Sequence, residues 1–204
     1  MYYSLLVPPT SRPRRELTRK EAREYFEWFV DQIPRRIEIL ERAVKTSVDN
    51  QFESWSANKT PASLDVLGPW FARHVEKEPV SEEFKEDWSL ELEKIEAKYR
   101  PIFDVPQWTL TNRTYSLIHD VGMYLGEVFR EHSPILEWQL DTKYKRSVDY
   151  QEPVLAAPGM DYGINPVRLV HVIALGFTDG TKPPSALHKV FDTWIVDLAR
   201  DQDE

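Results

Sequence analysis

The chain has 204 residues, a net charge of −8 and no cysteine. Its length fits one domain, which can bury enough apolar surface to form a core without disulfides or metals. The absence of cysteine excludes thiol nucleophiles, cysteine-bound zinc and iron–sulfur clusters. The acidic balance argues against nucleic acid as a partner, because a protein that binds phosphates needs a basic surface.

No segment of the sequence is typical of a signal peptide or a membrane span. The apolar run within residues 1–9 is short and has no preceding positive region. No window reaches the roughly 18 uninterrupted apolar residues of a spanning helix. We therefore expect a cytoplasmic protein that does not contact a membrane.

The first quarter of the chain is expected to be an arm followed by a long helix. Residues 1–9 are compatible with a short strand, and residues 10–16 complete an N-terminal arm rich in Pro and Arg. Thr18 and Glu21 have the spacing of a capping box. Apolar residues at steps of three or four then predict an amphipathic helix. Pro34 lies inside it and should kink or split it.

Two shorter helices should follow a polar connection over residues 49–62. Pro69 suits the first turn of one helix, which is expected to end near Glu76. Ser81 is placed to cap the other, along which apolar residues form a stripe over residues 84–99 that ends before Pro101.

A long central helix and a β-hairpin are expected next. Residues 101–110 are interpreted as a loop, and the helix is predicted over residues 111–132. Apolar and polar residues alternate over 136–140, which predicts a strand with one buried face. A second strand over 148–156 would pair with it, as an edge or broken strand because of Pro153.

Two helices complete the predicted fold. The segment opened by Pro166 is almost wholly apolar to Leu175 and is interpreted as a buried helix, with a strand as the alternative. Ser185 is expected to cap the last helix. The prediction is a single α+β domain over residues 1–204, mainly helical, with a small antiparallel β-hairpin at residues 135–157 packed on a helical core.

The central helix carries the polar residues best placed for a binding site. Asp120, Tyr124 and Glu127 recur at steps of four and three, so they share one helix face. Gly122 and Gly126 are one turn apart, although glycine inside a helix costs about 1 kcal/mol relative to alanine. This spacing indicates a close neighbour, either a crossing helix or a ligand. The predicted binding residues are Asp120, Gly122, Tyr124, Gly126, Glu127 and Trp138.

Motifs for a cofactor or a nucleophile are absent from the sequence. No pair among the five histidines has the HExxH spacing of a helical zinc site. His171 lies in an apolar segment and is interpreted as a core histidine. The sequence contains no GxSxG elbow and no glycine-rich phosphate-binding loop. We therefore expect no catalytic residues, no metal and no cofactor.

The central segment resembles a loose group of uncharacterised bacterial cytosolic proteins. In that group a helix ending in Tyr-x-Gly-Glu precedes a strand that contains tryptophan, as residues 124–127 and Trp138 do here. The group often has a glycine shortly before the tryptophan, where this chain has residues 135–137 without glycine. The likeness covers about 30 of the 204 residues. It implies a small bacterial domain, and some similar proteins are thought to be immunity or regulatory partners.

The sequence favours a non-catalytic cytoplasmic protein that acts by binding another protein. The absence of catalytic motifs and the acidic charge, which suits a basic partner, support this hypothesis. The resemblance adds an immunity-type or regulatory role, and a homodimer is a variant. The alternative is a small-molecule enzyme or ligand sensor that uses the carboxylates of Asp120 and Glu127.

Overall fold

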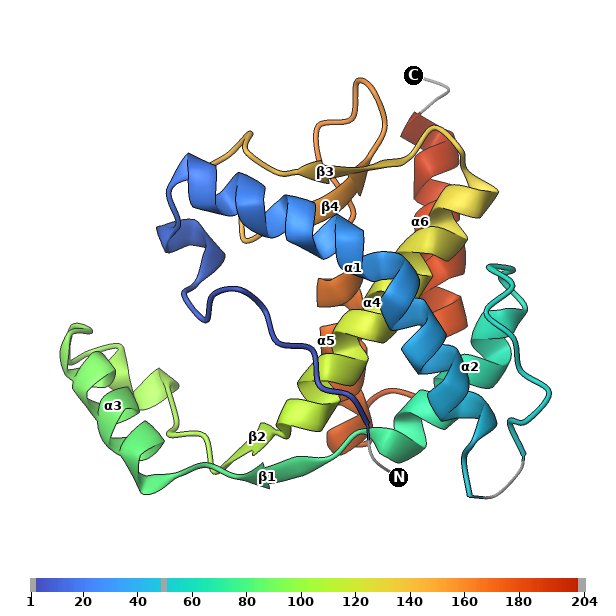
Figure 1. Ribbon diagram of the computed structural model, residues 1–204. Coiled ribbons are helices and arrows are strands. Elements are labelled where there is room, and N and C mark those ends of the chain that lie inside the picture. Colours follow the sequence, from blue (N-terminus) through green and yellow to red (C-terminus); the bar gives the residue numbers. More distant parts are fainter. Residues whose placement is uncertain (1–2, 49–50, 202–204) are drawn as a thin grey trace.

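The computed structural model describes residues 3–48 and 51–201 (Figure 1). The described residues form six α-helices, two short 3-10 helices and two separate two-stranded antiparallel sheets. The sheets are small and pack on the helices. This arrangement confirms the predicted fold class, a mainly helical α+β protein.

Helix α4 (Asn112–His132) runs through the middle of the molecule (Figure 1). Every residue from Asp120 to Phe129 is buried, so this stretch is enclosed on all sides. The helices that pack around it are α1 (Arg19–Lys45), α2 (Ser63–His74), α5 (Pro166–Thr178) and α6 (Ala186–Asp201). The predicted central helix is confirmed, and it is the element on which the others assemble.

Helix α1 begins at the predicted capping box. Thr18 Oγ1 accepts a hydrogen bond from the backbone N–H of Glu21, and the Glu21 carboxylate accepts one from the backbone N–H of Thr18. Pro34 does not split the helix, which is continuous from Arg19 to Lys45. The helix bends near its middle (Figure 1). Phe29 and Leu40 are buried on either side of the proline, and their burial offsets the hydrogen bond that proline removes.

The N-terminal segment does not form the short strand that its sequence allows. Residues 3–9 have no regular secondary structure, and the first two residues lie outside the described part of the chain. Side chains form hydrogen bonds with backbone groups that a strand would use for pairing. The N–H of Leu6 donates to Ser116 Oγ at 3.0 Å, and the carbonyl of Ser4 accepts from Arg36 Nη2 at 2.8 Å.

Helix α2 begins at Ser63, well before the predicted start at Pro69. Pro69 therefore lies inside the helix rather than in its first turn. Leu64 and Leu67, which precede the proline, are completely buried. Their burial against the core extends the helix beyond the boundary that local propensity indicates.

Residues 77–110 form an arm that projects from the helical body (Figure 1). Its elements are strands β1 (Lys77–Pro79) and β2 (Trp108–Leu110), which pair antiparallel at its base, and helices α3 (Glu82–Glu93) and η2 (Arg100–Ile102) at its tip. The predicted loop over residues 101–110 is wrong at both ends, where η2 and β2 lie. The helix predicted from the stripe over residues 84–99 is shorter and ends at Glu93. Strands of three residues carry too little alternation to be recognised in a sequence.

Strands β3 (Glu137–Leu140) and β4 (Pro153–Ala156) form the predicted antiparallel hairpin. Pro153 begins β4, a position where its missing N–H is tolerated. The second strand is shorter than the predicted range 148–156, because residues 141–152 form a long connection that includes several turns.

Helix α5 confirms the helical interpretation of the apolar segment after Asn165. The side chain of Asn165 caps this helix, since its Oδ1 accepts from the N–H of Arg168 at 3.0 Å. The last helix, α6, begins immediately after Ser185. Among the described residues, no helix combines the length and apolar character needed to cross a membrane.

Helices α4 and α5 approach closely at Gly122, where an added Cβ would lie 2.7 Å from Val167 Cα. We predict that Gly122→Ala lowers the free energy of unfolding by about 1–3 kcal/mol, the usual cost of overpacking. Alanine forms helices better than glycine, so helix propensity alone would raise the stability. A loss of stability would therefore come from the steric clash. Urea unfolding followed by circular dichroism measures it. An unchanged or raised stability would contradict the close approach of the two helices.

Candidate functional site

Asp120 is completely buried and pairs with Arg36 of α1. Arg36 Nε lies 2.7 Å from Asp120 Oδ1, and Arg36 Nη2 lies 2.7 Å from Oδ2. The guanidinium therefore binds the carboxylate through two parallel hydrogen bonds. Tyr3 Oη donates to the same carboxylate. Burial raises the pKa of Asp120 to about 6, and Arg36 opposes this rise. Asp120 thus connects α4 to α1 and to the N-terminal segment.

Tyr124 connects α4 to the segment that leads into α2. Its Oη accepts a hydrogen bond from the backbone N–H of Lys59 at 3.1 Å and shares another with Ser63 Oγ at 2.7 Å. Its ring packs edge-on against Trp55, with the ring centroids 5.4 Å apart. Burial raises the pKa of the Tyr124 hydroxyl, so this group stays protonated and able to donate.

Glu127 connects α4 to strand β3. Its Oε1 accepts from Trp138 Nε1 at 3.1 Å and from Arg130 Nη1 at 2.9 Å, while Oε2 accepts from Lys59 Nζ at 3.2 Å. Burial would raise the pKa of Glu127, but the hydrogen bonds from Arg130, Trp138 and Lys59 lower it below its ordinary value. The carboxylate is therefore ionised at neutral pH, and both of its oxygens are occupied by protein donors.

The two glycines of α4 each make room for a protein neighbour. The backbone of Val167 lies against Gly122, and the indole ring of Trp138 lies against Gly126. An added Cβ at position 126 would lie 2.2 Å from Trp138 Cζ2. The close neighbour that the spacing indicates is therefore α5 at one glycine and a side chain of β3 at the other. Of the predicted binding residues, Gly126, Glu127 and Trp138 lie together, whereas Asp120 and Tyr124 contact other segments.

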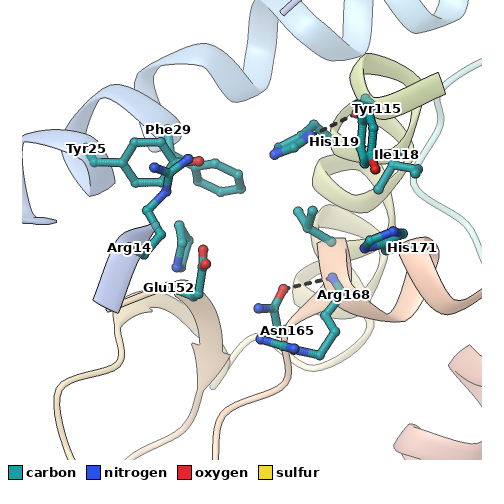
Figure 2. A pocket seen from close by; sticks show the side chains of 12 residues that line it. Arg14, Tyr25, Phe29, Tyr115, Ile118, His119, Glu152, Asn165, Arg168 and His171 are labelled. Atoms are coloured by element: carbon teal, nitrogen blue, oxygen red, sulfur yellow. Dashed lines mark hydrogen bonds between the residues drawn. The ribbon is translucent and has the colours of Figure 1, made fainter. Parts of the chain in front are cut away.

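A cavity of about 330 Å³ lies where α1, α4 and α5 meet the connection that precedes β4 (Figure 2). The charged and imidazole side chains on its walls are Arg14, His119, Glu152, Arg168 and His171. Figure 2 shows Arg14 and Tyr25 on one side, and His119 and His171 on the other. None of the six predicted binding residues lines this cavity. The structure therefore offers a second candidate site, separate from the polar face of α4.

Glu152 is half-buried on the cavity wall, and its carboxylate accepts no hydrogen bond within the described residues. Burial raises the pKa of Glu152 from 4.5 to about 7. The nearby cations of Arg14 and Arg168 oppose this rise, and Asp149 adds to it. Near neutral pH the carboxyl is therefore present in both protonation states, as a general acid or base requires.

His119 and His171 are neutral at pH 7, because burial lowers the pKa of both rings. His119 Nδ1 lies 2.9 Å from the backbone carbonyl oxygen of Tyr115. A carbonyl oxygen only accepts, so Nδ1 carries the proton and Nε2 keeps its lone pair. Figure 2 shows the His119 ring reaching into the space between α4 and α1. It can therefore accept a proton from a molecule in the cavity.

The two arginines of the cavity differ in how their charge is balanced. The Arg14 guanidinium stacks on the Tyr25 ring at 3.7 Å from its centroid, and Nη1 donates to the carbonyl of Arg12. Arg14 forms no ion pair within the described residues, and its buried Nε has no hydrogen-bond partner there. Arg168 Nε, in contrast, lies 2.7 Å from Asp149 Oδ1. Arg14 is therefore the cation left to balance a negative charge.

Gln151 joins the wall that carries Arg14 to the wall that carries Glu152. Its buried side chain donates from Nε2 to the carbonyl of Arg14 at 2.6 Å and to that of Leu17 at 3.0 Å. The backbone of Gln151 has a φ of 64°, in the left-handed region that non-glycine residues seldom adopt. Such backbone conformations are found where surrounding contacts hold them in place.

The cavity residues were not among those that the sequence singled out as a site. His171, interpreted as a core histidine, is half-buried and lines the cavity. Arg14, His119 and Glu152 come from three separate segments, so no spacing connects them. The one local signal is a carboxylate directly before β4, whose four residues are all buried. No group of three or more His, Asp or Glu side chains in the described residues is placed to hold a metal ion.

Breaking the Arg36–Asp120 pair should reduce stability strongly. We predict that Arg36→Met lowers the free energy of unfolding by about 3–5 kcal/mol, because it leaves the Asp120 carboxylate buried without its cation. The double variant Arg36→Met/Asp120→Leu should recover most of this loss, since it removes both charges. Urea unfolding of both variants measures the effect. Equal losses in the single and double variants would show that the charge is not the cause.

The raised pKa of Glu152 predicts a pH dependence of stability. Between pH 4.5, the ordinary value, and about pH 7, the folded protein binds more protons than the unfolded chain at this residue. The contribution of Glu152 to the free energy of unfolding therefore falls as the pH rises through this range. We predict that the loss over this range is about 1–3 kcal/mol smaller in Glu152→Gln than in the wild type, since the raised pKa of Asp120 acts equally in both. Glu137→Gln, at an exposed carboxylate of β3, should follow the wild type. Parallel profiles for wild type and Glu152→Gln would place the pKa of Glu152 near its ordinary value.

Three comparisons with known proteins find no match to this chain. No family model matches the chain, and no match is found among curated proteins or among solved structures.

Proposed function

We propose that the protein binds a small molecule in the cavity between α1, α4 and α5 and exchanges protons with it through Glu152 and His119. This is the enzyme or ligand-sensor alternative, placed at a different site from the carboxylates of α4. Glu152 carries the proposal, because its carboxyl has a pKa of about 7 and lies on a cavity wall without a hydrogen-bond partner in the described chain. Perturbed ionisable groups in a cavity are typical of functional sites.

The side chains around the cavity favour a small molecule with an anionic group. Arg14 has no ion-pair partner within the described residues, so it can balance a carboxylate or a phosphate. The neutral rings of His119 and His171 can accept hydrogen bonds from hydroxyl or amino groups. The volume of about 330 Å³ lies at the small end of the range that holds drug-sized ligands. Phe29 adds an apolar surface to the wall.

Asp120 and Glu127, the carboxylates that the sequence favours, support a binding role less well. Each accepts hydrogen bonds from protein side chains at both oxygens. A ligand would have to displace these donors, at the cost of leaving Arg36 or Lys59 without its partner. Binding of another protein, the function that the sequence favours, would use another surface, the projecting arm of residues 77–110.

The proposal is tested by identifying what the protein retains when it is purified from its own host. Native mass spectrometry and analysis of the extracted small molecules would compare wild type with Arg14→Gln and Arg15→Gln. Both residues lie in η1 (Arg14–Glu16), but only Arg14 lines the cavity. We predict an anionic molecule in wild type and in Arg15→Gln, with at least about tenfold less in Arg14→Gln because its cation is lost.

Two results would contradict this prediction. One is wild-type protein that carries no more small molecule than Arg14→Gln under several growth conditions. The other is equal loss in Arg14→Gln and Arg15→Gln, which would show that the effect is of overall charge. Unfolding curves of both variants would confirm that they are folded.

A further inference from the structure

The projecting arm keeps apolar side chains outside the protein core. Helix α3 has 12 residues and buries none of them. On the arm, Ile102 is 72% exposed, Leu90 is 57% exposed and Phe103 is 45% exposed. A helix of this length is only marginally stable in water unless one of its faces is packed. Apolar surface left exposed on a projecting segment is typical of interaction sites.

A groove of about 400 Å³ lies at the base of the arm. Its walls include Phe84, Trp108 and Leu110 from the arm and Leu175 from α5. These walls are mainly apolar, and Trp108 and Leu175 remain partly open to solvent. Aromatic residues are enriched at the centres of protein interfaces. The composition of the groove therefore suits the binding of an apolar side chain of a partner.

The arm that carries this apolar surface is also acidic. Residues 82–104 contain eight acidic and four basic residues, a net charge of −4. The basic residues are already used within the arm: Lys85 pairs with Glu82, Lys94 with Glu91 and Lys98 with Glu96, and Arg100 donates to backbone carbonyls. Glu83, Glu86 and Asp87 are exposed and form no ion pair within the described residues.

We propose that the projecting arm is a docking surface for a basic protein. The partner places an apolar side chain in the groove and Lys or Arg side chains against Glu83, Glu86 and Asp87. Charge complementarity selects this class of partner. A nucleic acid is repelled by the acidic arm, and so is a second copy of a chain whose own net charge is −8. The inference is independent of the cavity and its ligand.

Photo-cross-linking in the host tests this proposal. A benzophenone amino acid is placed at Leu90 on the arm or, as the control, at Val196 on α6, which is 50% exposed. We expect irradiation to link one protein of net positive charge at position 90 and not at position 196. A link to a second copy of this chain, a link to a neutral or acidic protein, or no link above the control would each overturn the proposal.

Charge reversal on the arm, with binding to the captured partner as the measurement, separates docking at the arm from a general effect of charge. The variant Glu83→Lys/Glu86→Lys/Asp87→Lys should weaken binding by about tenfold or more, and wild-type affinity should fall as salt rises. The control Glu27→Lys/Asp31→Lys/Glu38→Lys changes the net charge equally at exposed positions of α1. Equal weakening by both variants would overturn the proposed site.

Discussion

The structure depends on enclosing a helix that still carries polar side chains. Residues 120–129 of α4 are all buried, and a buried polar group is costly unless it finds a partner. Each polar group therefore specifies one of the surrounding segments. Asp120 specifies the position of α1 and the N-terminal segment, Tyr124 that of the chain before α2, and Glu127 that of β3. Apolar burial supplies the driving force, and these pairs select the arrangement.

The parts of the fold that the sequence predicts well are those with strong local signals. The capping box at Thr18 starts α1, and the alternation over residues 136–140 identifies β3. The errors occur where tertiary contacts override local preference. Burial of Leu64 starts α2 early, side-chain donors replace a strand at residues 3–9, and β1 and β2 are too short to show a period.

The candidate site was less predictable than the fold, for a related reason. A helix face can be read from spacing along one element, and the face of Asp120, Tyr124 and Glu127 does hold three buried or nearly buried polar groups. The cavity, in contrast, is assembled from separate elements. The pKa of Glu152 is raised only when folding buries its carboxyl. The sequence alone gives no sign of that environment.

The position of Gln151 has a consequence for how the cavity tolerates change. Its amide binds the carbonyl of Arg14, and its own backbone leads directly into Glu152. The backbone at Arg14 and Leu17 is therefore joined to the connection over residues 141–152 by this one buried amide, while the Arg14 guanidinium is held against Tyr25 of α1. A substitution at Gln151 would separate the two walls without touching either charged group. Tolerance to change in this connection of turns is therefore lowest at a residue that contacts no ligand.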